Sequence, residues 1–187
     1  MAKEQTGISG EFWFFSQLQR LGYEAYITLG NTKGIDLSVK LNNGSILTLE
    51  VKSKMNFGGS FQYLNIAKEQ NHFAVFVDLK TIKEKSGKTK LLGEPNCYII
   101  NSNDLDQIAF NWQSTSGAKG YGFEAKLLWY LKFQNTQSIT NGNINAFIDR
   151  HNLNKRIDFK YYNKIIWTLE DFENYYYQFK EKLKPDK

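Results

Sequence analysis

Two neighbouring segments of the chain, residues 35–41 and 47–52, alternate strictly between apolar and polar positions. A period of two is typical of β-strands that turn one face toward the core and the other toward solvent. The residues between them include Asn42, Asn43 and Gly44, which favour a tight turn. The pattern therefore predicts a β-hairpin with a three-residue loop, in which Gly44 takes the left-handed conformation that such loops commonly use.

The length of this loop decides which side chains share a face. A two-residue loop would set Asp36 opposite Val51 and would send Glu50 to the other side of the hairpin. A three-residue loop instead pairs Asp36 with Glu50, and it places all the apolar residues of both strands on one face. We therefore expect the second register. In that register the side chains of Asp36, Glu50 and Lys52 project from the same face.

The first element of the chain is predicted to be a helix over residues 7–21. Its apolar residues follow the helical spacing i, i+4, i+7, i+10, as Ile8, Phe12, Phe15 and Leu18. Glu11 falls on this stripe, which should face the sheet. Because carboxylates are rarely buried without a partner, we expect Glu11 to point at the strands and to join their acidic residues.

The remaining pattern predicts an α/β fold with a mixed central sheet. Residues 72–79 form a nearly continuous apolar run, as expected for a central strand that is covered on both faces. The other predicted elements are strands at 23–29 and 97–100 and helices at 61–71, 104–110, 122–131 and 169–183. No repeat or linker requires a second domain, so we expect one domain over residues 1–187.

Composition narrows the class of protein without choosing a function. The chain has 41% hydrophobic and 23% charged residues, which is ordinary for a globular protein, and a formal net charge of +5 that is compatible with a polyanionic partner. It has no apolar run near the roughly 20 residues that span a bilayer and no signal-like start, so we expect a cytoplasmic protein. The single cysteine excludes a CxxC metal site.

The predicted pair of acids points to a metal. Two carboxylates opposite each other on a hairpin repel unless a positive charge lies between them. Mg²⁺ prefers oxygen ligands and typically takes one or two carboxylates while it keeps several waters. Such an ion lowers the pKa of bound water and neutralises charge on a phosphate, and Lys52 is placed to orient or help deprotonate that water. The structural alternative is an ordinary solvated face of an antiparallel sheet.

The sequence Ile35-Asp36 followed by Glu50-Val51-Lys52 resembles the signature of the PD-(D/E)XK nucleases. The likeness covers roughly residues 7–101 and includes the helix glutamate, Glu11, although Ile35 stands where the signature has proline. It implies a restriction endonuclease-like αβββαβ core over 1–101, with residues 102–187 as a helical extension.

The resemblance also implies an activity, a cofactor and a set of site residues. The activity is hydrolysis of DNA by a restriction, repair or phage-defence endonuclease, with Mg²⁺ as cofactor and Mn²⁺ as a substitute. Asp36, Glu50 and the Val51 carbonyl would hold the metal, with Glu11 acting through water, and the catalytic set would be Glu11, Asp36, Glu50 and Lys52. The alternative function is a catalytically silent nucleic-acid-binding or protein-interaction module on the same fold. Cleavage of both strands of a duplex favours a homodimer.

Other charged residues have two interpretations each. Lys33 and Lys54 flank the predicted site and are candidates for binding the phosphate backbone. The lysine-rich segment 80–90 is more typical of a solvated hairpin loop than of a phosphate-binding surface. His72 and His151 lack the spacing of metal ligands, which favours structural roles for both.

Overall fold

The computed structural model describes residues 3–28, 34–55, 60–63, 66–107, 110–113, 119–124 and 164–174. It has a helix α1 (Lys3–Arg20) and a six-stranded sheet with the order β1-β2-β3-β5-β8-β11. The strands of this sheet are β1 (Glu24–Ile27), β2 (Leu37–Lys40), β3 (Ile46–Lys54), β5 (His72–Asp78), β8 (Asn96–Asn101) and β11 (Ile166–Trp167). Strands β3 and β5 are parallel, whereas the other neighbours are antiparallel. The prediction of an α/β fold with a mixed central sheet is therefore confirmed.

The hairpin of β2 and β3 has the register that the apolar pattern predicts. Leu37 pairs with Leu49 and Val39 with Leu47, and these residues are all fully or almost fully buried. The Leu41 N–H donates to the Ser45 carbonyl at 2.8 Å, and Gly44 has a φ of +80°. The loop therefore has three residues and a left-handed glycine, as predicted. A register shifted by one residue would turn the polar side chains of the hairpin toward the core.

Helix α1 forms as predicted but presents a different face to the sheet. Ile8 and Phe12 are 47% and 56% exposed, so the predicted stripe is wrong at these two positions. The inward residues are instead Thr6, Gly10, Phe14 and Leu18, which follow each other at intervals of four. Small side chains at the first two of these positions let the helix lie close to β3, and no apolar pattern marks them. Phe14 and Leu18 belong to the main core.

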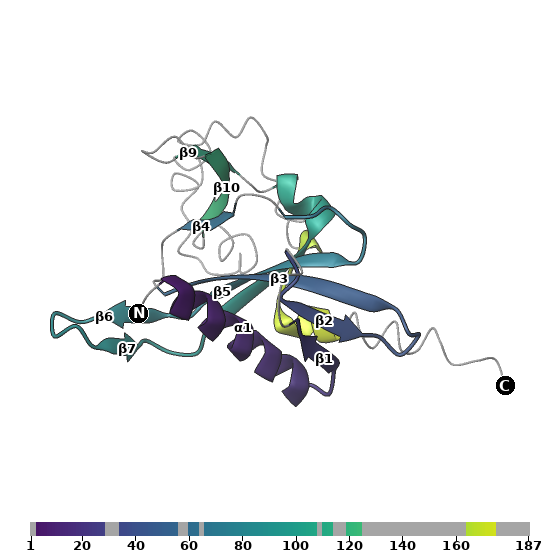
Figure 1. Ribbon diagram of the computed structural model, residues 1–187, viewed down its shortest axis with the longest axis horizontal. Coiled ribbons are helices and arrows are strands. Elements are labelled where there is room, and N and C mark those ends of the chain that lie inside the picture. The colour runs from purple at the N-terminus through teal and green to yellow at the C-terminus, as the bar shows by residue number, and fades with distance from the viewer. Residues whose placement is uncertain are drawn as a thin grey trace.

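Strand β5 runs through the middle of the sheet, and every residue from His72 to Asp78 is buried. It pairs with β3 on one side and β8 on the other, as expected for the apolar run in the sequence. Figure 1 shows α1 below the large sheet and a small sheet above it. Side chains of β3 therefore alternate between the helix side and the small-sheet side.

The helix predicted at 61–71 is wrong. Residues 60–63 form β4 (Ser60–Tyr63), and residues 66–71 are not helical. Strand β4 pairs with β10 (Lys119–Glu124), which also pairs with β9 (Phe110–Gln113), and the three form the small sheet. Phe61, Gln62 and Tyr63 suit a strand once a distant partner is available, because strand formation depends on packing more than on local preference.

The described part of the chain after residue 101 is less helical than predicted. A short 3₁₀ helix η1 (Ser102–Gln107) begins it, and β9, β10 and β11 follow among the described residues. The helix predicted at 122–131 is wrong where it overlaps β10, and its residues 125–131 lie outside the described part of the chain. Residues 169–174 are helical, as predicted, and residues 175–183 of that predicted helix are not described. In the described ranges no helix is long and apolar enough to span a bilayer.

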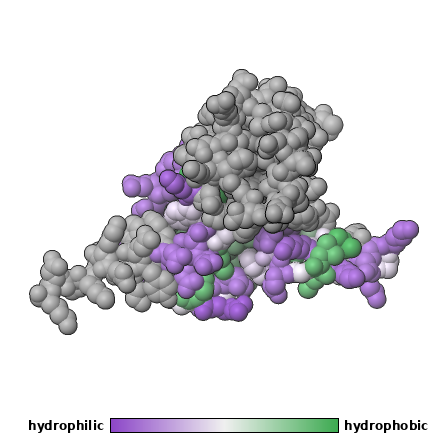
Figure 2. Space-filling view, turned by 180° about the vertical axis from the view of Figure 1, so that it is seen from behind, coloured by the Kyte–Doolittle hydropathy of each residue, from purple (hydrophilic) through white to green (hydrophobic). Residues whose placement is uncertain are grey.

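The lysine-rich segment forms a hairpin of β6 (Thr81–Lys83) and β7 (Thr89–Leu91). Figure 1 shows it projecting away from the body of the molecule beside the start of α1. Figure 2 shows a hydrophobic patch next to hydrophilic residues on this projection. Its exposed apolar residues are Ile82, Leu91 and Leu92. The hairpin interpretation of this segment is therefore confirmed, and its role stays open.

Candidate active site

Asp36 lies where β2 leaves β3. Its N–H donates to the Leu49 carbonyl at 2.9 Å, although Leu49 already pairs with Leu37. Asp36 and Leu37 therefore both face Leu49, which is the arrangement of a β-bulge. A bulge of this kind redirects a side chain. The Asp36 carboxylate accordingly turns toward β3, where its Oδ2 accepts the Val51 N–H at 2.6 Å. The ladder of β2 and β3 therefore ends at the pair of Leu37 and Leu49, and the predicted pair of Asp36 and Glu50 does not form.

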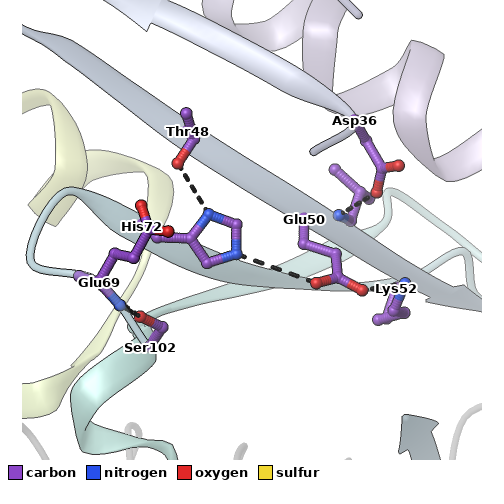
Figure 3. Close-up of polar contacts among 8 residues, drawn as sticks. Asp36, Thr48, Glu50, Lys52, Glu69, His72 and Ser102 are labelled. Carbon is purple, nitrogen blue, oxygen red and sulfur yellow. Dashed lines mark hydrogen bonds and ion pairs between the residues drawn. The ribbon is translucent and has the colours of Figure 1, made fainter. Parts of the chain in front are cut away.

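Glu50 and Lys52 stand on the face of β3 that looks away from α1. Alternate residues of the strand point the other way, and Ser53 donates from its Oγ to the Thr6 carbonyl of the helix at 2.7 Å. Glu50 is only 4% exposed. Its Oε1 lies 2.6 Å from the Lys52 Nζ, whereas its Oε2 is buried without a hydrogen-bond partner. Figure 3 shows the two side chains side by side, with the Asp36 carboxylate next to them.

His72 is a member of the site that sequence reasoning assigned to a structural role. Strand β5 pairs in parallel with β3 so that His72 lies beside Thr48, and its Nδ1 is 2.8 Å from the Thr48 Oγ1. Its Nε2 faces the Glu50 Oε2 at 3.9 Å (Figure 3). The only sequence signal was a histidine at the start of a buried strand, because its neighbours depend on a pairing between strands far apart in the chain.

The charges of the site shift the acid pKa values in opposite directions. Burial raises the pKa of Asp36, and the Glu50 charge adds to this effect, although the Val51 N–H and Lys52 oppose it. Burial also works against ionised Glu50, but His72 and Lys52 outweigh it and lower the pKa of Glu50. A buried acid beside a partly buried one, with the pKa of one lowered and that of the other raised, is typical of functional sites.

Glu11 lies on α1, on the other side of β3 from Glu50, and the charges of Asp36 and Lys52 act on it. Its pKa is raised by burial and then by the charge of Asp36, while Lys52 lowers it. Contact between the helix and β3 holds it there, because Ser53 bonds the first turns of α1 and Gly10 leaves no side chain between them. The charge of Glu11 therefore interacts with the charges of Asp36 and Lys52, although the predicted helix stripe was wrong.

Of the two lysines predicted to bind the phosphate backbone, only Lys54 lies within the described residues. Lys33 lies outside the described residues, as does His151. The Lys54 Nζ is 3.9 Å from the Asp78 Oδ2 and 5.2 Å from the centre of the Phe61 ring, and its side chain is 12% exposed. These neighbours favour an internal role for Lys54, so its predicted contact with phosphate stays a prediction that the geometry does not favour.

The donor set suits a hard cation that keeps part of its water shell. Among the residues that the structure describes, no three His, Cys, Asp or Glu side chains form a group able to hold a metal. Asp36 and Glu50 supply two carboxylates. In a strand, the N–H and carbonyl of one residue point to the same edge. The Val51 carbonyl therefore points to the edge of β3 where the Val51 N–H bonds Asp36. Two carboxylates, one carbonyl and water match Mg²⁺.

Comparison with known proteins gives structural likeness without a match in sequence. No protein-family model matches the chain, and no curated protein matches it in sequence. A bacterial homing endonuclease of known structure is similar over 84% of this chain and 100% of its own, with a TM-score of 0.42 and 11% sequence identity. At that TM-score and identity the likeness carries no argument about the site.

Proposed function

We propose that the protein is a Mg²⁺-dependent nuclease of the PD-(D/E)XK type that hydrolyses phosphodiester bonds of DNA. The observation that supports this most directly is the cluster formed by Asp36, Glu50 and Lys52 where β2 and β3 separate. The charges of Asp36 and Lys52 also act on Glu11. A formal net charge of +5 is compatible with a polyanionic substrate. Restriction, repair and phage defence are the settings in which such an activity would serve.

Asp36, Glu50 and the Val51 carbonyl would hold Mg²⁺, with Glu11 acting through a water, and Mn²⁺ would substitute for it. When bound, the ion lowers the pKa of a water and neutralises charge on the scissile phosphate. The hydrogen bond from Val51 N–H fixes one oxygen of Asp36, so the other oxygen is oriented before any ligand arrives.

Lys52 has two tasks in this proposal. Without substrate it neutralises Glu50, whose carboxylate is buried and 2.6 Å away. With substrate it turns its ammonium group to the attacking water or to a phosphate oxygen, for which its 32% exposed side chain has room. The ion pair therefore stabilises the buried Glu50 carboxylate, and its exchange for substrate contacts prepares the site for reaction.

The direct test is plasmid nicking with Mg²⁺ and with EDTA. Asp36→Ala and Glu50→Ala should reduce nicking at least about a hundredfold, because each removes a group that acts at the reacting phosphate. Lys52→Ala should lose turnover and keep Mg²⁺ binding. The matched control is Glu24→Ala, since Glu24 is an exposed carboxylate of β1 that pairs with Lys40 of β2, at the end of this ladder away from Asp36. Nicking by the Glu50→Ala protein at the wild-type rate would refute the mechanism.

The oligomeric state remains a prediction. One site of this kind cuts one strand, so cleavage of both strands of a duplex favours two copies acting together. Sedimentation of the protein with and without DNA would test this. Double-strand cuts made by a protein that sediments only as a monomer would remove the need for a dimer.

A further inference from the structure

We infer that His72 is a positioning residue for Glu50, with Thr48 fixing its tautomer and its Nε2–H held ready for the Glu50 carboxylate. The inference rests on the proposed function, since it explains how a buried metal-binding acid remains oriented when Lys52 leaves it. Nothing in the sequence pattern around His72 predicts this role, because the three residues come from two strands that pair in parallel.

The contact is built from buried atoms. His72 is 1% exposed and Glu50 is 4% exposed. The His72 Nε2 and the Glu50 Oε2 both lie buried without a hydrogen-bond partner, and they face each other at 3.9 Å. That distance is about 1 Å longer than an ordinary hydrogen bond. The His72 nitrogen can donate and the Glu50 oxygen can accept, so a small rotation of the carboxylate is enough to form a hydrogen bond between them.

Glu50 and Thr48 together decide which nitrogen of His72 carries the proton. Its hydroxyl can donate to Nδ1 or accept from it, at the observed distance of 2.8 Å. If Nδ1 carried the proton, the lone pair of Nε2 would face a carboxylate oxygen, and the two would repel. If Thr48 donates, Nε2 carries the proton and faces Glu50 as a donor. Electrostatics therefore select the Nε2–H tautomer.

The Nε2–H of His72 can replace Lys52 as a hydrogen-bond donor to Glu50. In the structure the Glu50 Oε1 is held by Lys52, the residue that must also reach the substrate. When Lys52 turns away, the opposite oxygen can close on His72 without any movement of the backbone. One carboxylate oxygen is then fixed by the protein and the other stays directed at the metal, which is how an outer-shell partner orients a ligand.

Two pairs of variants separate this role from simple core packing. His72→Phe keeps a ring of similar size without a donor, whereas His72→Gln keeps a donor of similar reach. Thr48→Val removes the hydroxyl with little change of shape, and Thr48→Ser keeps it. Calorimetric Mg²⁺ titration should show binding about 10- to 100-fold weaker in His72→Phe, with most of it restored in His72→Gln. A purely structural histidine would leave the two variants with equal Mg²⁺ affinity.

Nitrogen NMR of the imidazole at pH 8 reads the contact without any activity. We expect the Nε2–H tautomer in the wild-type and Thr48→Ser proteins and a mixture of tautomers in Thr48→Val. A double-mutant cycle of His72→Phe with Glu50→Gln in urea unfolding should show that the histidine matters less once the carboxylate charge is gone. An Nδ1–H tautomer in the wild-type protein, or an additive cycle, would overturn the inference.

The outcomes also separate this inference from the proposed function. If the wild-type protein binds no Mg²⁺ and nicks no plasmid, the nuclease proposal fails, and the tautomer and the cycle still decide whether His72 holds Glu50. If the wild-type protein binds Mg²⁺ and nicks DNA but His72→Phe binds Mg²⁺ normally, the nuclease proposal stands and the positioning role is refuted.

Discussion

Gly10 of α1 lies directly against Ser53 of β3, so that a Cβ added at Gly10 would stand 2.3 Å from the Ser53 Cβ. Carbon atoms that are not bonded to each other do not come that close, so only a glycine allows the helix to contact β3 here. The same serine donates from its Oγ to the Thr6 carbonyl at 2.7 Å. This contact sets the height of α1 over the sheet and, one residue further along the helix, the position of Glu11.

Gly10→Ala should therefore destabilise the protein in spite of the higher helix propensity of alanine. Overpacking costs about 1–3 kcal/mol, against a propensity gain of about 1 kcal/mol. Gly7→Ala is the matched control, because its added Cβ would meet only the Glu11 Oε1, at 3.9 Å, and it should stabilise the helix. Urea unfolding of both variants checks the prediction. Equal stability of the two would mean that the helix does not rest on Gly10.

Asp36→Asn should stabilise the protein in the absence of metal. The raised pKa of Asp36 means that its ionisation is disfavoured in the folded state, first by burial and then by the Glu50 charge. Asparagine removes the charge and keeps an oxygen to accept the Val51 N–H. Because the group is partly open to solvent, we expect a gain below about 1 kcal/mol at pH 7 in EDTA.

The sign of the pH dependence follows from the same shift. A raised pKa in the folded state favours the protonated form, so the cost of ionised Asp36 is present above that pKa and disappears as pH falls through it. The melting temperatures of wild type and Asp36→Asn should therefore converge in the acidic range just above the ordinary aspartate value. A constant difference from pH 7 down to pH 4 would show that the charge is not responsible.

The part of the site that lies within one hairpin is predictable from sequence, because a hairpin is formed by residues close together in the chain. The alternation of residues 35–41 and 47–52 fixes the register of one hairpin, and with it the neighbourhood of Asp36, Glu50 and Lys52. The bulge that turns the Asp36 side chain toward Val51 has no such signal, since it adds no turn residue and changes no apolar position.

The distant part of the site depends on contacts that no short pattern encodes. His72 meets Thr48 because two strands 24 residues apart pair in parallel, and their register is set by the whole core. Residues 60–63 form a strand because β10 lies about 60 residues later in the chain. The face of α1 was predicted from its largest apolar residues, whereas the contact with β3 uses the smallest one, Gly10.

Lys54→Ala should reduce stability and leave DNA binding nearly unchanged. Its Nζ is 3.9 Å from the Asp78 Oδ2, and the Asp78 side chain is only 1% exposed. Removing one partner leaves a buried carboxylate without its cation, at a cost of about 3 kcal/mol. Urea unfolding and DNA titration measure the two effects separately. A large loss of DNA affinity with normal stability would instead restore Lys54 to the phosphate-binding role that the sequence suggested.

The hairpin of β6 and β7 is the surface where we expect the strongest effect of charge on DNA binding. Lys85, Lys88 and Lys90 are exposed on it, and Figure 1 shows the hairpin projecting from the sheet. Each lysine that contacts a phosphate releases a condensed counterion and steepens the fall of affinity with salt. Lys85→Glu with Lys88→Glu should therefore weaken binding and flatten the dependence of log affinity on log salt concentration by roughly one to two units.

The control for this experiment is a double reversal far from the hairpin, Arg20→Glu with Lys164→Glu. Both positions are exposed, and the two double variants change the formal net charge of +5 by the same amount. If binding depends on a hairpin–phosphate contact, only the hairpin variant should lose salt slope, because overall charge acts on both variants alike. Equal slopes in the two variants would leave the hairpin as a solvated loop. Nicking at low salt should persist in the hairpin variant, because the acids on β2 and β3 remain intact.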